Sequence, residues 1–551
     1  MTVVPSGGRQ LLWLLLAACL VAGPASGQGP DDEFRNLLAE LRDASFADKE
    51  LIADRLIATG HMGARPVLTA LLEDRLFIRQ QDQHVFIVKS IGETLTSYEL
   101  IDPVSLEDTG AATPDELAKI GTNNRLRRFL RTTIARFALA SPDAEVRLDA
   151  VKELLRSLDA PAIELLRQRK GSETDSRVTY EIETALALAS LDDGDSAARV
   201  SAIQTLADRL SPEVRNRLAA LLEKADDGSF AEKDEAVRAA AADAIEGIDT
   251  ARSIYTGIET LFFGLSLGSV LVLAAIGLAI TFGVMGVINM AHGELMMLGA
   301  YTTYVVQTMM PRHIDASVLV AVPAAFVVAG IAGVLIERTI IRFLYGRPLE
   351  TLLATFGVSL VLQQLVRSVF SANNRSVVTP GWMSGTLQIN DALAITYNRL
   401  YIVFFTVIVF GILLAVLKRT RLGLDIRAVS QNRAMARAMG IRSEWVDAMT
   451  FGLGAGIAGV AGVALSQLTN VGPNLGQSYI IDSFMVVVFG GVGNLWGTFI
   501  GGISLGIINK LLEPYAGAVL GKIFVLVALI LFIQRRPRGL FPQTGRAAEA
   551  A

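Results

Sequence analysis

Residues 261–282 form an uninterrupted apolar stretch, LFFGLSLGSVLVLAAIGLAITF, which contains no charged residue. At a rise of about 1.5 Å per residue, a helix of this length crosses a hydrocarbon core of about 30 Å. Further apolar stretches follow at 287–307, 317–336, 351–370, 400–417, 446–468 and 519–533. We therefore expect a polytopic membrane protein.

The residues that precede this apolar region have a different composition. Residues 31–250 contain 42 acidic and 28 basic side chains, whereas residues 251–551 contain 12 acidic and 21 basic ones. The first part is typical of an acidic water-soluble domain, and the second is basic because its short loops are basic. Neither part has the dense positive charge that nucleic acid binding requires, so we predict no nucleic acid partner.

The first residues resemble an export signal. Arg9 precedes an apolar core at 11–22, and the small residues at 25–27 suit cleavage before Gln28. The core is short for a spanning helix, and an uncleaved anchor is the alternative. The single cysteine, Cys19, excludes an internal disulfide, and its lipidation stays open. We predict a signal peptide at 1–27, an exported domain at 28–250, a membrane domain at 251–545 and a tail at 546–551.

The exported domain shows helical periodicity with few strand-like alternations. Residues 143–150 and 234–241 share the pattern D-x-x-V-R-x-x-A, and Pro142 and Pro212 mark helix starts. This predicts stacked antiparallel helix pairs of the HEAT type, because no single pair can bury its apolar face alone. The segment 77–99 breaks the pattern and predicts one small hairpin. Such a domain is typical of a docking surface or a spacer.

The distribution of lysine and arginine predicts the orientation of the membrane domain. Positive charge gathers after the third, fifth and last apolar stretches, and the positive-inside rule places these segments in the cytoplasm. The region 480–509 has the glycine-rich break GGVGN at 490–494, which predicts two short or re-entrant helices. An exported N-terminal domain and a cytoplasmic C-terminus then need nine crossings. We expect an all-α fold with eight to nine crossings of the bacterial cytoplasmic (inner) membrane.

Polar residues within the second apolar stretch are candidates for a solute pathway. Asn289, His292 and Glu294 lie at or near bilayer depth, where a charged group costs about 2.5–3.5 kcal/mol on insertion scales. They should therefore face the bundle interior, either as a polar lining or as caps and locks between helices. His292 and Glu294 are two residues apart and point to different helix faces. Asn494, in the glycine-rich break, is a further candidate. No residues are suitably spaced for a metal site.

A long cationic loop lies between the fifth and sixth apolar stretches. Residues 423–441 favour one amphipathic helix that ends at Gly440, since glycine commonly follows a last helical turn. Its apolar face has Ile426, Val429, Met435, Ala438 and Met439. Such a helix suits either the surface of anionic lipid or the groove of a partner protein.

Three motifs, GLAITFGVMGVINMAHGELMMLGAY, RAVSQNRAMARAMGI and VVVFGGVGNLWGTFIGG, resemble permeases of the branched-chain amino acid type of ABC importers, over about residues 255–545. The resemblance implies separate ATPase subunits, an extracytoplasmic solute-binding protein, and a second permease or a second copy of this chain. The ATPase contact that it implies has Gln431, Arg433, Ala434, Arg437 and Gly440. The exported domain is similar to an arrangement in the urea-transporting branch of the family.

The resemblance therefore predicts ATP-driven import of urea or a related short amide by alternating access, with a branched-chain amino acid as the alternative. Gly517 and Gly521 are too close together for a nucleotide loop, and Ile523 stands where Ser or Thr would hold Mg²⁺. We expect a transport subunit that is not an enzyme and binds no cofactor. A passive channel would not need the cationic loop. A membrane sensor would need a cytoplasmic signalling domain, and only 18 residues follow Ile533.

Overall fold

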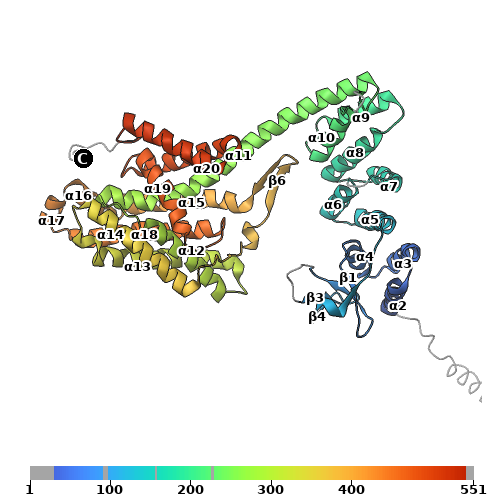
Figure 1. The fold of residues 1–551 in the computed structure, drawn as a ribbon, viewed down its shortest axis with the longest axis horizontal. Coiled ribbons are helices and arrows are strands. Elements are labelled where there is room, and N and C mark those ends of the chain that lie inside the picture. Colours follow the sequence, from blue (N-terminus) through green and yellow to red (C-terminus); the bar gives the residue numbers. More distant parts are fainter. Residues whose placement is uncertain (1–29, 91–96, 156–157, 225–228, 542–551) are drawn as a thin grey trace, which may run out of the picture. The chain divides into compact units, whose positions relative to one another are not determined.

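The computed structural model describes residues 30–90, 97–155, 158–224 and 229–541 (Figure 1). The chain divides into two compact units, Met1–Gly247 and Ile248–Ala551. The boundary lies within the long helix α11 (Glu235–Met285). The expected signal peptide, with Cys19, and the expected tail at 546–551 lie outside the described residues.

The first unit starts with α2 (Pro30–Asp43), α3 (Phe46–Ala58) and α4 (Ala64–Leu72). These helices share an apolar core with the beginning of α5 (Asn124–Leu139), in which Phe34, Leu41 and Leu126 are fully buried. Side-chain caps fix the helix starts, as the Asn123 Oδ1 accepts a hydrogen bond from the Leu126 amide at 2.7 Å. The amphipathic pattern thus builds the helical start of this unit.

A five-stranded antiparallel sheet lies between α4 and α5. Its order is β4-β3-β2-β1-β5, with β1 (Leu76–Arg79), β2 (Val85–Val88), β3 (Tyr98–Ile101), β4 (Asp108–Ala112) and β5 (Leu117–Lys119). The all-α expectation is therefore wrong here, because the single hairpin predicted at 77–99 is extended by further strands. The sequences of β4, DTGAA, and β5, LAK, have weak strand propensity. Their pairing depends on neighbouring strands, so the local pattern did not show it.

The rest of the first unit is helical. It comprises α6 (Ala144–Leu155), α7 (Ala160–Lys170), α8 (Ser176–Ser190), α9 (Ser196–Leu206), α10 (Pro212–Leu221) and the first part of α11. Each helix packs mainly on helices close to it in sequence, such as α5 on α6 and α8 on α9. The HEAT-type assignment remains a prediction.

The two copies of the D-x-x-V-R pattern have the same local contacts. The Arg147 Nη1 donates to the carbonyl oxygens of Ser141 and Pro142, both at 2.9 Å. The Arg238 Nη1 donates to the carbonyls at the equivalent positions, Glu232 at 2.9 Å and Lys233 at 2.8 Å. In each copy the arginine reaches back five and six residues and satisfies carbonyls just before its own helix. One sequence pattern thus builds one local structure twice.

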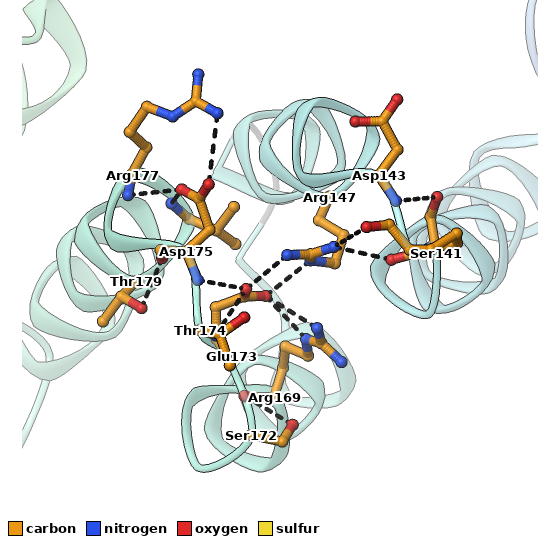
Figure 2. Close-up of polar contacts among 12 residues, drawn as sticks. Ser141, Asp143, Arg147, Arg169, Ser172, Glu173, Thr174, Asp175, Arg177 and Thr179 are labelled. Carbon is orange, nitrogen blue, oxygen red and sulfur yellow. Dashed lines mark hydrogen bonds and ion pairs between the residues drawn. The ribbon is translucent and has the colours of Figure 1, made fainter.

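Glu173 connects three helices of the first unit (Figure 2). Its side chain is completely buried and accepts hydrogen bonds from Arg147 at 2.8 Å and Arg169 at 3.0 Å. The backbone amides of Thr174 and Asp175 donate to the same carboxylate at 2.9 and 3.0 Å. Hydrogen bonding from the Arg147 guanidinium is the main cause that lowers the pKa of Glu173 from 4.5 to about 2.

We expect Glu173→Gln to loosen α6, α7 and α8, because Arg147 would lose its buried counter-charge. Removing one partner of a buried ion pair costs about 3 kcal/mol. Hydrogen exchange of the amides of these helices in the intact protein should become faster by on the order of 100-fold. The control is Glu164→Gln, at an exposed position on α7, which should change exchange little. Equal exchange in both variants would contradict a structural role for Glu173.

The same carboxylate makes the first unit sensitive to acid. The folded-state pKa of Glu173 lies below its ordinary value, so its stabilisation is complete above about pH 4.5. It is lost as the pH falls toward 2, because the folded state must then take up a proton. Exchange of α6 amides, corrected for the intrinsic rate, should therefore accelerate over this range in the wild type. In Glu173→Gln this part of the pH dependence should be absent.

The second unit contains the apolar helices. After α11 come α12 (His292–Met309), α13 (Ile314–Thr339), α14 (Pro348–Phe370), α15 (Tyr397–Arg419), α16 (Arg421–Gln431), α17 (Arg433–Ala438), α18 (Ser443–Ser466), α19 (Leu475–Gly490) and α20 (Leu495–Arg535). A hairpin of β6 (Thr386–Asn390) and β7 (Leu393–Thr396) precedes α15. By length and composition, six helices of the described chain can cross a membrane: α11, α13 with its short extension, α14, α15, α18 and α20. Nine crossings remain a prediction.

Glycines interrupt the last helices. Gly491 and Gly493 have φ values of 105° and 77°, which only glycine adopts easily, and they separate α19 from α20 at the expected break. Within α20, Gly517 has a φ of 75° and divides the helix into two parts. Lys522 in the second part forms an ion pair with Asp482 of α19 at 2.9 Å. The second part therefore lies against α19.

Helix α18 is at the centre of the second unit and packs against α11, α12 and α13. Its glycines meet the backbone of other helices: Gly454 meets Gly277 of α11, and Gly459 meets Gly299 of α12. A β-carbon at Gly277, Gly299 or Gly454 would overlap backbone atoms of the facing glycine, and one at Gly459 would overlap the Ala325 carbonyl oxygen of α13. Small residues allow this close approach, which drives association where lipid removes the hydrophobic effect.

We expect Gly299→Ala to destabilise the second unit, because the added methyl group would overlap the Gly459 carbonyl. Overpacking of this kind costs about 1–3 kcal/mol. The thermal midpoint of the detergent-solubilised protein, followed by size-exclusion chromatography, should fall. Gly411→Ala is the matched control, since no atom lies within 4 Å of its β-carbon position on α15. An equal thermal midpoint for both variants would show that the close contact between Gly299 and Gly459 does not contribute to stability.

Candidate functional site

Five polar residues follow α14 at intervals of four: Thr351, Thr355, Ser359, Gln363 and Arg367. Residues four apart lie on one face of a helix, so these side chains form a polar stripe. The first four are buried in the second unit. The spacing of the stripe is visible in the sequence, although no prediction above used it.

The stripe faces the beginning of α12. The Met290 amide donates to the Thr355 Oγ1 at 3.1 Å, and this hydroxyl lies 3.4 Å from the Ile288 carbonyl oxygen. One turn further along α14, the Glu294 Oε1 accepts hydrogen bonds from the Ser359 Oγ at 3.0 Å and the Gln363 Nε2 at 2.7 Å. The polar stripe therefore forms hydrogen bonds both with the turn before α12 and with the Glu294 carboxylate in the first turn of α12.

Glu294 keeps one oxygen without a hydrogen-bond partner. Its side chain is buried, and its Oε2 has no donor among residues 30–90, 97–155, 158–224 and 229–541. A carboxylate oxygen can accept two hydrogen bonds, and leaving it unsatisfied in an apolar environment is costly. Glu294 thus has capacity to accept a donor from another molecule.

Arg367 places a positive charge on the same stripe. It lies one turn beyond Gln363, or about 6 Å along the helix. Its Nη2 donates to the Asn474 Oδ1 at 2.8 Å, next to the start of α19. The stripe therefore carries a basic group, and Glu294 of α12, which accepts hydrogen bonds from Ser359 and Gln363 of the stripe, adds an acidic group beside it.

The other predicted pathway residues have different surroundings. His292 is fully buried, and its Nε2 lies 2.9 Å from the Ala274 carbonyl oxygen of α11. The Asn289 Oδ1 accepts a hydrogen bond from the Ala291 amide at 3.0 Å, which caps the turn before α12. From α12, the His292 side chain thus contacts α11 and the Glu294 side chain contacts α14, which agrees with the expectation that they point to different helix faces.

Asn494 lies at another place in the second unit. It is the N-cap of α20, where its Oδ1 accepts a hydrogen bond from the Gly497 amide at 3.1 Å. Its Nδ2 donates to the Phe541 carbonyl oxygen at 3.3 Å. Asn494 therefore caps α20, and its hydrogen bonds do not involve Glu294, Ser359 or Gln363.

The cationic loop contains two helices, where the sequence predicted one. Asn432 has an extended backbone, with φ −157° and ψ 99°, and its Oδ1 caps α17 by accepting from the Met435 amide at 2.9 Å. Asparagine competes for backbone hydrogen bonds, which explains the break. As a result Ile426 is buried, while Met435 and Met439 are 60% and 78% exposed. The prediction of a single apolar face that includes both methionines is wrong.

Arg433 connects α17 to α18. It forms an ion pair with the buried Asp447 of α18 and lies over the ring of Tyr345, 4.3 Å from the ring centroid. The Arg437 Nε also donates to the Ser443 Oγ at 2.6 Å. Gly440, with φ 88°, ends the segment. Gln431 and Ala434 are exposed. The cationic loop therefore has exposed residues on both sides of Arg433, which pairs with α18.

Comparison with known proteins gives one consistent family. Residues 260–533 match the family described as "Branched-chain amino acid transport system / permease component". The high-affinity branched-chain amino acid transport system permease protein LivH of Salmonella typhimurium is 31% identical over 294 residues, which cover 51% of this chain and 94% of the relative. Its counterpart BraD of Pseudomonas aeruginosa is 31% identical over 297 residues, which cover 52% and 96%.

A more distant relative carries a different name. The ribose import permease protein RbsC of Escherichia coli is 27% identical over 297 residues, which cover 50% of this chain and 85% of the relative. No solved structure matches the chain. The family match lies within the second unit.

Proposed function

Because this chain belongs to the family of branched-chain amino acid transport system permeases, we propose that it is the membrane permease subunit of an ATP-driven importer. Relatives of this kind are transport subunits, so the chain provides the path and other subunits provide the energy. Its partners are ABC ATPases in the cytoplasm and a solute-binding protein outside. A second permease, or a second copy of this chain, completes the path.

We propose that the solute is a branched-chain amino acid, the alternative drawn from the sequence, and no longer favour urea. The relatives named for branched-chain amino acid transport match over almost their whole length, which supports this choice. Another relative is named for ribose import, so similarity alone does not decide the solute, and the side chains of the path must carry the argument.

The observation that carries the proposal is a pair of groups of opposite charge, Glu294 of α12 and Arg367 of the polar stripe of α14. A free amino acid has an ammonium group and a carboxylate, whereas urea has no charge. The unpartnered oxygen of Glu294 suits the ammonium, and Arg367 suits the carboxylate. Charge-assisted hydrogen bonds are about twice as strong as neutral ones. A path for urea would need only neutral donors and acceptors.

The cationic loop would transmit the work of the ATPases to this stripe. Exposed Met435 and Met439 provide a soft apolar surface that suits a groove in a partner. Arg433 attaches this surface to α18, and α18 packs on α12, which carries Glu294. A movement of α17 would therefore move α18 and change the contact between α12 and α14. This is the physical form that alternating access takes here.

The proposal predicts ATP-dependent uptake of labelled leucine, but not of labelled urea, by proteoliposomes with the full set of subunits. Glu294→Gln should lower leucine uptake by about 10- to 100-fold, because it removes a charged hydrogen bond worth about 1.5–3 kcal/mol. Glu350→Gln, at an exposed position in the first turn of α14, is the control. Urea uptake that leucine does not inhibit would contradict the substrate, and full activity of Glu294→Gln would contradict the site.

Arg433→Gln should separate ATP hydrolysis from transport. Asp447 would stay buried without its cation, so α17 would no longer be held to α18. The assembled importer should still hydrolyse ATP, but leucine transported per ATP should fall at least about tenfold, or by about 1.4 kcal/mol of coupling. Arg442→Gln, which removes an exposed charge nearby, should leave this ratio unchanged. A normal ratio in Arg433→Gln would exclude this attachment as the coupling element.

A further inference from the structure

A separate cavity lies where the ends of α11 and α15 meet α16 and the start of α20. Its volume is about 440 Å³, within the range of roughly 300–1,000 Å³ that is typical of ligand sites. One wall is apolar and includes Ile280, Val284, Leu414 and Leu417. The polar stripe of α14 contributes no residue to this cavity, so it differs from the proposed substrate site.

Other lining residues are polar or positively charged. They include Lys418, Arg427, Ser430, Gln431 and Asn494. No aspartate or glutamate lines the cavity, and in the described part of the chain neither Lys418 nor Arg427 has a carboxylate within ion-pair distance. Arg427 donates to the Leu417 carbonyl oxygen, which holds its guanidinium beside the apolar wall. Lys418 and Arg427, two cations without a neighbouring carboxylate in the described part of the chain, thus line the same cavity.

We propose that this cavity binds the phosphate headgroup of an anionic phospholipid. A phosphate supplies the negative charge that Lys418 and Arg427 lack, and acyl chains suit the wall of Ile280 and Leu414. Trp496, which is 52% exposed, lies at the same cavity, and tryptophan favours the membrane interface. A small soluble anion would leave the apolar wall without a partner. The predicted cytoplasmic orientation of this end places it in the leaflet where anionic lipid is common.

The site assigns different roles to the two helices of the cationic loop. Ile426, Arg427, Ser430 and Gln431 of α16 line the cavity, whereas the exposed methionines belong to α17, after the break at Asn432. A lipid headgroup would hold α16 at the membrane surface, and α17 would remain free to contact a protein. The sequence suggested that one helix binds either anionic lipid or a partner protein. In this proposal α16 binds the lipid and α17 binds the partner protein.

The test compares two double variants that remove equal charge. Lys418→Gln with Arg427→Gln removes both cations of the cavity, whereas Arg419→Gln with Arg421→Gln removes two exposed cations outside it. Each protein is purified in detergent with phosphatidylglycerol and phosphatidylcholine in equal amounts, and bound lipid is counted by native mass spectrometry. We expect the cavity variant to lose phosphatidylglycerol about fivefold or more per cation removed. The surface variant should keep it.

Several results would overturn the proposal. Equal loss from both double variants would mean that only general surface charge attracts the lipid. No loss from either would mean that the cavity binds no lipid phosphate. Displacement of phosphatidylglycerol by soluble glycerol phosphate at similar concentration would make a soluble anion the ligand. Lys418→Arg with Arg427→Lys keeps both charges and should keep the lipid, so loss there would show that folding, and not charge, explains the first variant.

Discussion

The close contact of glycine backbones around α18 is the constraint on which the second unit depends. Between helices in lipid there is no hydrophobic driving force, so backbones must approach for dispersion contacts to hold them. Gly454 meets Gly277 of α11, and Gly459 meets Gly299 of α12. These contacts fix the position of α12, and therefore the position of Glu294. Without them the polar stripe of α14 would not have its partner.

Polar groups in such an environment must find partners within the protein. The stripe on α14 does this for the Glu294 Oε1, while the Glu294 Oε2 has no hydrogen-bond partner in the described part of the chain. An unsatisfied buried oxygen is a cost, and a substrate donor can relieve it. At the other end of the same unit, Arg433 and Asp447 make a second polar contact between α17 and α18. Packing through α18 links the two places.

The sequence predicted the features that depend on local pattern. Apolar length located the six helices that can cross a membrane by length and composition, but it also predicted a span at 287–307, where α12 is not one of these six. The glycines at 490–494 located the break between α19 and α20. Local pattern does not predict contacts between residues that are distant in sequence. The strands β4 and β5 have sequences of weak strand propensity, so their place in the sheet was not predicted. Likewise, nothing in the local sequence indicates that Arg433 pairs with Asp447. Asn432 was a visible but weak signal for the split of the loop. The period of four along α14 was a clear signal, and it explains Glu294 better than that residue considered alone.

Coupled transport in this protein depends on a mechanical link from the cationic loop, through α18, to the contact between α12 and α14. The most direct measurement is the distance between spin labels at Met309→Cys and Val369→Cys, exposed positions near the ends of α12 and α14, in the assembled importer. Trapping ATP should change this distance in a chain with Arg433, and should leave it unchanged in Arg433→Gln. The same change in both chains, or no change in either, would contradict the link.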